Sequence, residues 1–166
     1  MNNKNQPKQG THLSSEPPFC SPITEKKSAP NAGISERILV VDDESIIVLL
    51  LREALEGLPG CQVITATSGE EALELFEQQA FDLLITDYSL SGIDGITLAT
   101  KIQKLSPQIP IIMLTAYANA SLRRRATNIF IRRVIAKPVR LSELRRLALE
   151  LLSERKKNGP SNPESH

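Results

Sequence analysis

Five short apolar runs, separated by longer amphipathic stretches, most constrain what this chain can fold into. The runs occupy residues 37–41, 61–66, 82–86, 110–114 and 132–136. Their apolar residues are contiguous rather than alternating, as in strands that are covered by helices on both faces. Polar or turn-forming residues bound each run, so the pattern predicts five strand–helix units joined in a parallel sheet.

The stretch after the first run has the period of a helix, with one apolar stripe. The residues that share this predicted buried face are Ile47, Leu50, Leu51, Ala54, Leu55 and Leu58. Ile46, Val48 and Leu49 lie off the stripe, and we expect them to face solvent. The last stretch of the domain repeats the period, with Leu144, Leu147, Ala148, Leu151 and Leu152.

Five right-handed strand–helix units predict an α/β fold, a doubly wound five-stranded parallel sheet with five helices. Five strands fit the flavodoxin-like strand order 2-1-3-4-5. Ligands of such sheets bind at the carboxyl edge where the strand order reverses, which here lies between the first and third strands. A length of 166 residues suits one domain of this kind.

The two ends of the chain lack the apolar pattern. Residues 1–35 are rich in Pro, Ser, Asn and Lys, and residues 156–166 combine charge, Gly and Pro. Because neither end can bury enough apolar surface to order, we expect a disordered N-terminal tail (1–35), a folded domain (36–155) and a disordered C-terminal tail (156–166).

The expected location is the cytoplasm, without membrane contact. The longest apolar run, residues 46–51, is far shorter than the ~20 residues that span a bilayer, and no signal-peptide-like segment precedes the domain. Cys20 and Cys61 are too few for a disulfide framework, which favours a reducing compartment.

Polar residues follow four of the five predicted strands. In chain order they are Asp42 and Asp43, then Asp87, then Thr115, and finally Lys137 with Pro138. Because the carboxyl ends of parallel strands share one edge, we expect the three carboxylates to meet there. They would repel one another by roughly 1 kcal/mol per pair in water at ~4 Å, and more at a lower dielectric constant. A hard divalent cation such as Mg²⁺ and the Lys137 ammonium could compensate this repulsion and neutralise a phosphoryl group during transfer to a carboxylate.

The segments VVDDE, ITDYSLSGIDG, IIMLTA and IAKP resemble those of the receiver domain of two-component response regulators, and the resemblance covers about residues 36–155. It implies that Asp87 is phosphorylated by a histidine kinase or a histidine phosphotransfer protein. It also implies that Asp42, Asp43 and Asp87 hold Mg²⁺ together with the backbone carbonyl of Ser89.

The resemblance assigns roles to further positions as well. Thr115 and Lys137 would contact the phosphoryl oxygens, and the small Ala116 would leave the approach open. Ser89 and Tyr117 occupy positions that influence the lifetime of the phosphorylated state. The bond between Lys137 and Pro138 is expected to be cis, which X-Pro bonds tolerate.

Three features of the chain depart from the family pattern. Ser91 stands where a Pro usually follows the phosphoacceptor by four residues. Val134 stands where a Tyr or Phe often swings with the threonine. The short Gly-Ala element before the fifth strand is replaced by NIFIRR.

Positive charge gathers in the last third of the chain. Residues 1–118 carry 8 Lys and Arg against 15 Asp and Glu, whereas residues 119–166 carry 12 against 4. The arginines around the fourth helix, fifth strand and fifth helix are Arg123, Arg124, Arg125, Arg132, Arg133, Arg140, Arg145 and Arg146. We expect this basic face to dock an acidic surface of a downstream protein. We do not expect nucleic-acid binding, because no aromatic residues interleave with the arginines and no reader motif follows.

The leading hypothesis is a stand-alone receiver in a two-component phosphorelay. Phosphorylation of Asp87 would add a charge of about −1.5 to −2 and switch a protein-binding surface, with the off-stripe apolar residues of the first helix docking the phosphodonor. Beyond phosphorylation and dephosphorylation of Asp87, we expect no enzymatic activity.

Two other functions compete with this hypothesis. One is a phosphorylation-independent, receiver-like interaction module, which Val134 favours. The other is a hydrolase with an aspartyl-phosphate intermediate. Such enzymes resemble one another in a DxD pair after the first strand, whereas Asp42 and Asp43 are adjacent and no cap insertion follows.

Overall fold

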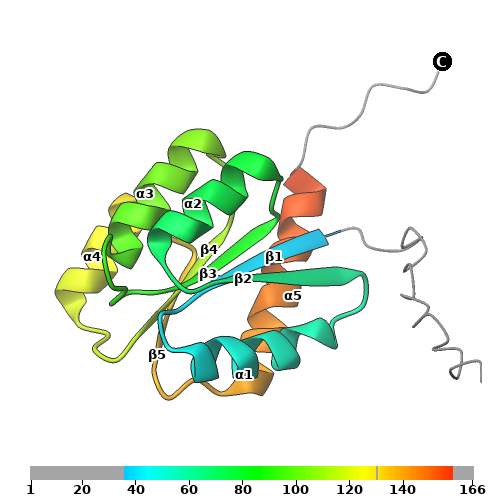
Figure 1. The fold of residues 1–166 in the computed structure, drawn as a ribbon, viewed down its shortest axis with the longest axis horizontal. Helices are drawn as coiled ribbons and strands as arrows, with labels where there is room; N and C mark the ends of the chain where they lie inside the picture. The colour runs from blue at the N-terminus through cyan, green and yellow to red at the C-terminus, as the bar shows by residue number, and fades with distance from the viewer. Residues whose placement is uncertain (1–35, 130, 159–166) are drawn as a thin grey trace, which may run out of the picture. The chain divides into compact units, whose positions relative to one another are not determined.

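The computed structural model describes residues 36–129 and 131–158 (Figure 1). In this part of the chain five strands form one sheet: β1 (Glu36–Val41), β2 (Cys61–Ala66), β3 (Leu83–Asp87), β4 (Ile111–Thr115) and β5 (Arg133–Ala136). Their order is β2-β1-β3-β4-β5, and every neighbouring pair is parallel. The predicted fold class and strand order are therefore confirmed.

Five helices cover the two faces of this sheet. They are α1 (Ser45–Glu56), α2 (Gly69–Gln78), α3 (Gly95–Leu105), α4 (Ala120–Asn128) and α5 (Leu141–Asn158). Buried residues of α2, α3 and α4 belong to one core cluster, and those of α1 and α5 belong to the other. Within the described ranges, none of the helices has the length and apolar character that crossing a bilayer requires.

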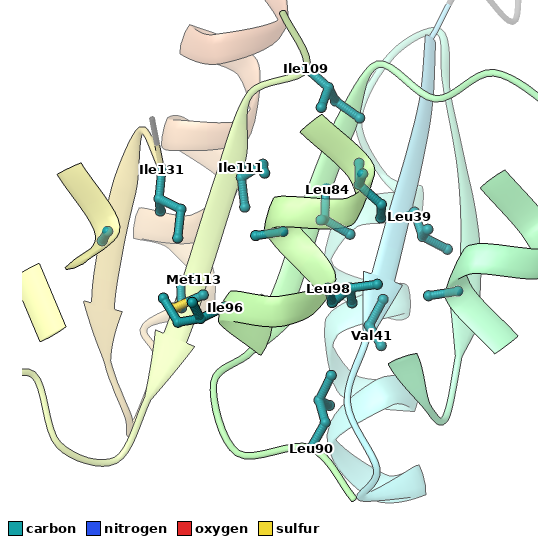
Figure 2. Packing of buried hydrophobic residues seen from close by; sticks show 14 of the residues in the cluster. Leu39, Val41, Leu84, Leu90, Ile96, Leu98, Ile109, Ile111, Met113 and Ile131 are labelled. Carbon is teal, nitrogen blue, oxygen red and sulfur yellow. The ribbon is translucent and has the colours of Figure 1, made fainter. Parts of the chain in front are cut away.

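The strands supply both core clusters because they are covered on both sides. Along β1, Leu39 and Val41 join the cluster under α3, whereas Ile38 and Val40 join the cluster under α1 and α5. Figure 2 shows the first of these clusters, with Leu98 of α3 lying over the side chains of β1, β3 and β4. This two-sided burial explains why the runs are contiguous rather than alternating.

The buried face of α1 differs from the predicted stripe. Val48 is only 6% exposed, so its expected solvent exposure was wrong, and Leu50 is 48% exposed although burial was predicted. Ile46 and Leu49 are confirmed as exposed, at 69% and 61%. Every residue of 46–51 is apolar, so periodicity alone could not fix the rotation of the helix. Packing of Leu51 and Leu55 in the core cluster on the sheet fixes it instead.

Two boundaries also differ from the prediction. Asp87 and Thr115 are the last residues of β3 and β4, one position inside the strands rather than after them. At the other end of the domain, α5 continues to Asn158, three residues beyond the predicted limit at 155. Lys156 Nζ lies 3.0 Å from Glu36 Oε1 of β1, and this ion pair holds the last turn of α5 against the sheet. The tail predicted for 1–35 lies outside the described residues, and so do residues 159–166 of the tail predicted for 156–166.

Gly95 allows α3 to begin close to the end of β3. Its N–H donates to the carbonyl of Tyr88 at 3.0 Å, and Asp94 caps the helix by accepting a hydrogen bond from the N–H of Thr97 at 2.7 Å. A Cβ atom on Gly95 would lie 2.2 Å from the carbonyl oxygen of Asp87. Because that neighbour is backbone, only a shift of the loop after β3 could relieve the overlap.

We therefore expect Gly95→Ala to lower the free energy of unfolding by about 1–3 kcal/mol, the usual cost of overpacking. Urea unfolding followed by circular dichroism measures this change. The matched control is Thr97→Ala, at an exposed position of the same helical turn, for which we expect a change within about 0.5 kcal/mol. Equal stability of the two variants would contradict the close approach.

Candidate functional site

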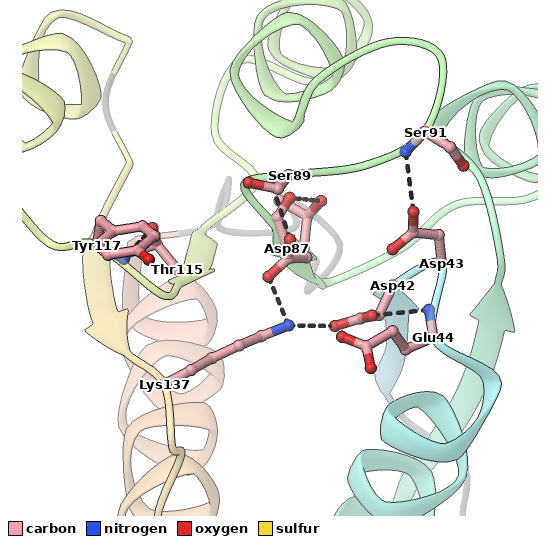
Figure 3. Close-up of polar contacts among 10 residues, drawn as sticks. Asp42, Asp43, Glu44, Asp87, Ser89, Ser91, Thr115, Tyr117 and Lys137 are labelled. Carbon is pink, nitrogen blue, oxygen red and sulfur yellow. Dashed lines mark hydrogen bonds and ion pairs between the residues drawn. The ribbon is translucent and has the colours of Figure 1, made fainter.

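Four strands deliver polar side chains to the carboxyl edge of the sheet. Asp42 follows β1, Asp87 ends β3, Thr115 ends β4 and Lys137 follows β5. Figure 3 shows these side chains together at that edge. Asp42 is 0% exposed, Asp87 5% and Thr115 2%. Polar groups so deeply buried require partners, and the structure supplies them.

Lys137 joins the two buried carboxylates. Its Nζ lies 2.8 Å from Oδ2 of Asp42 and 2.7 Å from Oδ1 of Asp87 (Figure 3). Burial acts to lower the pKa of Lys137, but hydrogen bonds and charge attraction from Asp42 and Asp87 outweigh it and raise the pKa above its ordinary value. The side chain is therefore an ammonium ion at neutral pH and acts as a fixed positive charge between two strand ends.

Main-chain amides orient the other carboxylate oxygens. Oδ1 of Asp42 accepts a hydrogen bond from the N–H of Glu44 at 3.0 Å, and Oδ2 of Asp87 accepts one from the N–H of Ser89 at 2.7 Å. In addition, the Thr86 hydroxyl donates to the carbonyl of Asp87 at 2.9 Å. Each buried carboxylate thus has one ammonium and one amide partner, which fixes its direction.

The expected meeting of three carboxylates is not what the structure shows. Asp43 is exposed, and its Oδ2 accepts a hydrogen bond from the N–H of Ser91 at 3.1 Å. Among residues 36–129 and 131–158, no three Asp, Glu, His or Cys side chains lie close enough to share a metal ion. The reason is electrostatic, because the Lys137 ammonium attracts Asp42 and Asp87 to itself, while Asp43 finds a partner in the loop after β3.

The charge balance at this edge nevertheless fits a divalent cation. Asp42, Asp43 and Asp87 carry three negative charges, and Lys137 offsets one of them. Two negative charges remain, and the donors are carboxylate oxygens, which hard cations such as Mg²⁺ prefer. The backbone carbonyl of Ser89, another oxygen donor, belongs to the loop that follows Asp87. The charge and the donor chemistry at this edge therefore fit a divalent cation, whereas the spacing of the three carboxylates does not place them around one.

The remaining predicted positions surround this centre. Thr115 Oγ1 accepts a hydrogen bond from the N–H of Tyr117 at 3.1 Å, and the Tyr117 ring is 82% exposed. Ala116 is also exposed, which leaves the edge open. The peptide bond between Lys137 and Pro138 is cis, as the resemblance implied. Val134 is half-buried and packs against the core cluster beneath α3 and α4.

Sequence reasoning missed two contributors to the site. Tyr88 follows Asp87 directly, and its hydroxyl accepts a hydrogen bond from Nη1 of Arg125 in α4 at 3.4 Å. The amide of Glu44 is the other contributor, through its bond to Asp42. The DG pair at 94–95 was a readable signal for the start of a helix. By contrast, no local pattern links Tyr88 to a residue 37 positions away.

Cys61 is not a second reactive centre in the described part of the chain. Burial, with a smaller contribution from neighbouring Glu36, raises the pKa of its thiol to about 11. The thiolate, which is the nucleophilic form, is therefore scarce at neutral pH.

A comparison with protein-family models identifies the domain. The model described as the response regulator receiver domain matches residues 38–149. This range begins in β1 and ends in α5, so it includes the complete polar edge.

Two curated relatives show the contexts in which similar sequences occur. The alkaline phosphatase synthesis transcriptional regulatory protein PhoP of Bacillus subtilis (strain 168) is 45% identical over 83 residues, which cover 50% of this chain and 34% of PhoP. The sensor histidine kinase RcsC of Salmonella typhi is 33% identical over 134 residues, which cover 81% of this chain and 14% of RcsC. The chain thus spans about a third or less of the length of these relatives.

Solved structures agree with the fold. A CheY-like response regulator receiver domain from Methanospirillum hungatei has a TM-score of 0.71 at 33% identity and covers 75% of this chain and 98% of its own. The response regulator TrrA of Thermotoga maritima, in complex with Mg²⁺ and BeF, has a TM-score of 0.63 at 36% identity and covers 70% of this chain and 98% of its own. From the matched family model and this shared fold, the chain belongs to the receiver-domain family of two-component response regulators.

Proposed function

We propose that this receiver is a phosphoacceptor in which the Asp87 carboxylate takes a phosphoryl group from a histidine kinase or a histidine phosphotransfer protein. The observation that carries the proposal is the placement of Lys137, whose ammonium contacts both Asp87 and Asp42 at the carboxyl edge. A buried carboxylate held in a fixed direction beside a positive charge suits nucleophilic attack on an anionic donor.

The transfer requires one bond to form and one to break. An Asp87 oxygen bonds to phosphorus, the bond from phosphorus to the donor histidine nitrogen breaks, and the electron pair stays on that nitrogen. Lys137 offsets the negative charge of the arriving group, and the buried Thr115 hydroxyl can donate to a phosphoryl oxygen.

Asp42, Asp43, Asp87 and the Ser89 carbonyl are the residues that would hold Mg²⁺. When bound, Mg²⁺ supplies further positive charge that neutralises phosphoryl oxygens. The residual charge at the edge supports this assignment, as does the similarity to TrrA, whose structure is a complex with Mg²⁺ and BeF.

A docking surface for the phosphodonor is available on α1. Ile46, Leu49 and Leu50 are exposed, and they follow Asp42 and Asp43 within two helical turns. We assign this α1 patch to apolar contact with the helices of a phosphodonor, because a buried apolar contact beside the acceptor would bring the two reacting groups together. The similarity to sensor histidine kinases such as RcsC is consistent with a kinase partner.

The proposed output face is narrower than the arginine count suggested. Arg145 donates to the carbonyls of Ala54 and Gly57 at the end of α1, so it stabilises the fold. Arg133 and Arg146 both pair with Glu150. Of the eight arginines that the sequence assigned to this face, five have no acidic partner among the described residues and do not bond the end of α1: Arg123, Arg124, Arg125, Arg132 and Arg140. The face for an acidic downstream protein therefore centres on α4.

The competing function is a receiver-like interaction module that works without phosphate. Val134 favours it, because this half-buried aliphatic side chain packs into the core and offers no aromatic ring to move with Thr115. In either case we propose no turnover of an external substrate beyond phosphorylation and dephosphorylation of Asp87.

Incubation with Mg²⁺ and acetyl phosphate, followed by intact mass measurement, separates these two functions. We expect one phosphoryl adduct in the 166-residue chain and none in Asp87→Asn or when EDTA removes Mg²⁺. The matched control is Asp94→Asn, because Asn caps a helix as well as Asp does and the adduct should persist. A native chain that forms no adduct would support the phosphate-independent module.

The α1 patch makes a second prediction. Leu49→Lys should slow phosphotransfer from the cognate histidine protein by about tenfold or more, because an apolar contact worth roughly 1.4 kcal/mol is replaced by a charge. Phosphorylation by acetyl phosphate should not change. Leu105→Lys is the control, since Leu105 is 57% exposed at the far end of α3 and should affect neither donor. Equal slowing of Leu49→Lys with both donors would refute the docking role.

A further inference from the structure

A small cavity beside α4 adjoins the proposed phosphoacceptor, and the mechanism above places no group in it. Its volume is about 150 Å³, the space of about five water molecules. Its walls include Tyr88 and Ser89 after β3, Thr115 at the end of β4, and Ser121 and Arg125 of α4. We call it the α4 cavity. Because Ser89 lines the cavity and donates its N–H to Asp87, a group in the cavity would lie beside the reacting carboxylate.

The charge of the α4 cavity is positive. Arg125 is the only ionised side chain among the described residues that line it. The hydroxyl of Tyr88 accepts a hydrogen bond from Arg125 Nη1 at 3.4 Å, which leaves the other guanidinium N–H groups free to bind. The sequence of α4, ASLRRRATN, contains no acidic residue that could neutralise Arg125 from within the helix.

The N-terminus of α4 adds further donors. Asn119 caps the helix by accepting a hydrogen bond from the N–H of Leu122 at 2.8 Å. The N–H groups of Ala120 and Ser121 have no partner among the described residues. Such free amides carry the positive end of the helix dipole and favour an anion. Ser121 and Arg125 are one helical turn apart, so they share the face that borders the cavity.

A buried hydroxyl lies where the cavity meets the phosphoacceptor edge. Thr115 is 2% exposed and lines the cavity, and its oxygen accepts a hydrogen bond from the N–H of Tyr117. Among described residues its hydroxyl proton has no acceptor. With the phosphoryl group on the Thr115 hydroxyl, the Arg125 guanidinium and the helix amides remain as donors for a ligand in the cavity, and no carboxylate is among the described residues that line it.

We propose that the α4 cavity is a subsite for the carboxylate leaving group of small acyl phosphates, with Arg125 as its counter-ion. This inference rests on the proposed phosphorylation of Asp87. In the reaction an Asp87 oxygen bonds to phosphorus, the bond from phosphorus to the acyl oxygen breaks, and the electron pair remains on that oxygen. The product is a carboxylate, so negative charge develops where Arg125 can stabilise it.

The subsite makes Arg125 a residue that distinguishes between donors. Phosphoramidate transfers the same phosphoryl group, but its leaving group departs as ammonia and gains no negative charge. A phosphohistidine donor likewise releases an imidazole rather than an anion. The benefit of Arg125 is therefore confined to acyl phosphates.

The test compares initial rates of Asp87 phosphorylation by acetyl phosphate and by phosphoramidate in the full chain with Mg²⁺, followed by intact mass. Arg125→Gln should lower the acetyl phosphate rate by about tenfold, which corresponds to about 1.4 kcal/mol, and leave the phosphoramidate rate within about twofold. Arg125→Lys, which retains the charge, should recover part of the lost rate. Arg124→Gln is the matched control, because Arg124 is exposed on the same helix but does not line the cavity.

Each other outcome decides against the subsite. Equal slowing with both donors would assign Arg125 a general electrostatic or structural effect, and no slowing with either would remove it from the reaction. Slowing by Arg124→Gln as large as that by Arg125→Gln would point to the net charge of α4. A native chain that takes phosphate from neither donor would overturn the proposed phosphorylation of Asp87 itself, and the subsite with it. If the native chain is phosphorylated by both donors and Arg125→Gln changes the two rates equally, the subsite alone is overturned.

Discussion

The contact of one ammonium with two buried carboxylates determines the arrangement of the functional edge. Asp42 and Asp87 lie at the ends of adjacent strands, and burying two carboxylates is costly unless a positive partner compensates them. Lys137 reaches them from the end of β5, on the other side of β4. The parallel order 2-1-3-4-5 brings these ends together at one edge, so the strand order serves the site as well as the core.

The sequence could predict most of this edge because its signals are local and agree with one another. Contiguous apolar runs indicate strands covered on both sides, and such strands in strand–helix units must be parallel. Once the strands are parallel, the residues at their ends share an edge whatever the details of packing. Asp42, Asp87, Thr115 and Lys137 could therefore be placed together without any knowledge of side-chain contacts.

The parts that could not be predicted depend on long-range choices among locally equal alternatives. The run at 46–51 fits several rotations of α1, and the packing of Leu51 and Leu55 on the sheet selects the one in which Val48 is buried and Leu50 exposed. Arg145 looks like an exposed basic residue in the sequence, yet it caps the end of α1 from a position 91 residues away. Asp43 could have joined the other carboxylates, but the amide of Ser91 holds it apart.

The position of α4 connects the proposed input and output of the domain. Its N-terminal turn and Arg125 border the phosphoacceptor edge, whereas Arg123 and Arg124 of the same helix are exposed and have no acidic partner within the described ranges.

Phosphorylation would add a charge of about −1.5 to −2 next to this helix. That charge would compete with the Tyr88 hydroxyl for Arg125 and attract the positive end of α4. Movement of this nine-residue helix as a unit would carry its exposed arginines with it. Through this electrostatic coupling, a phosphorylated receiver with Val134 in place of an aromatic ring would still change its surface.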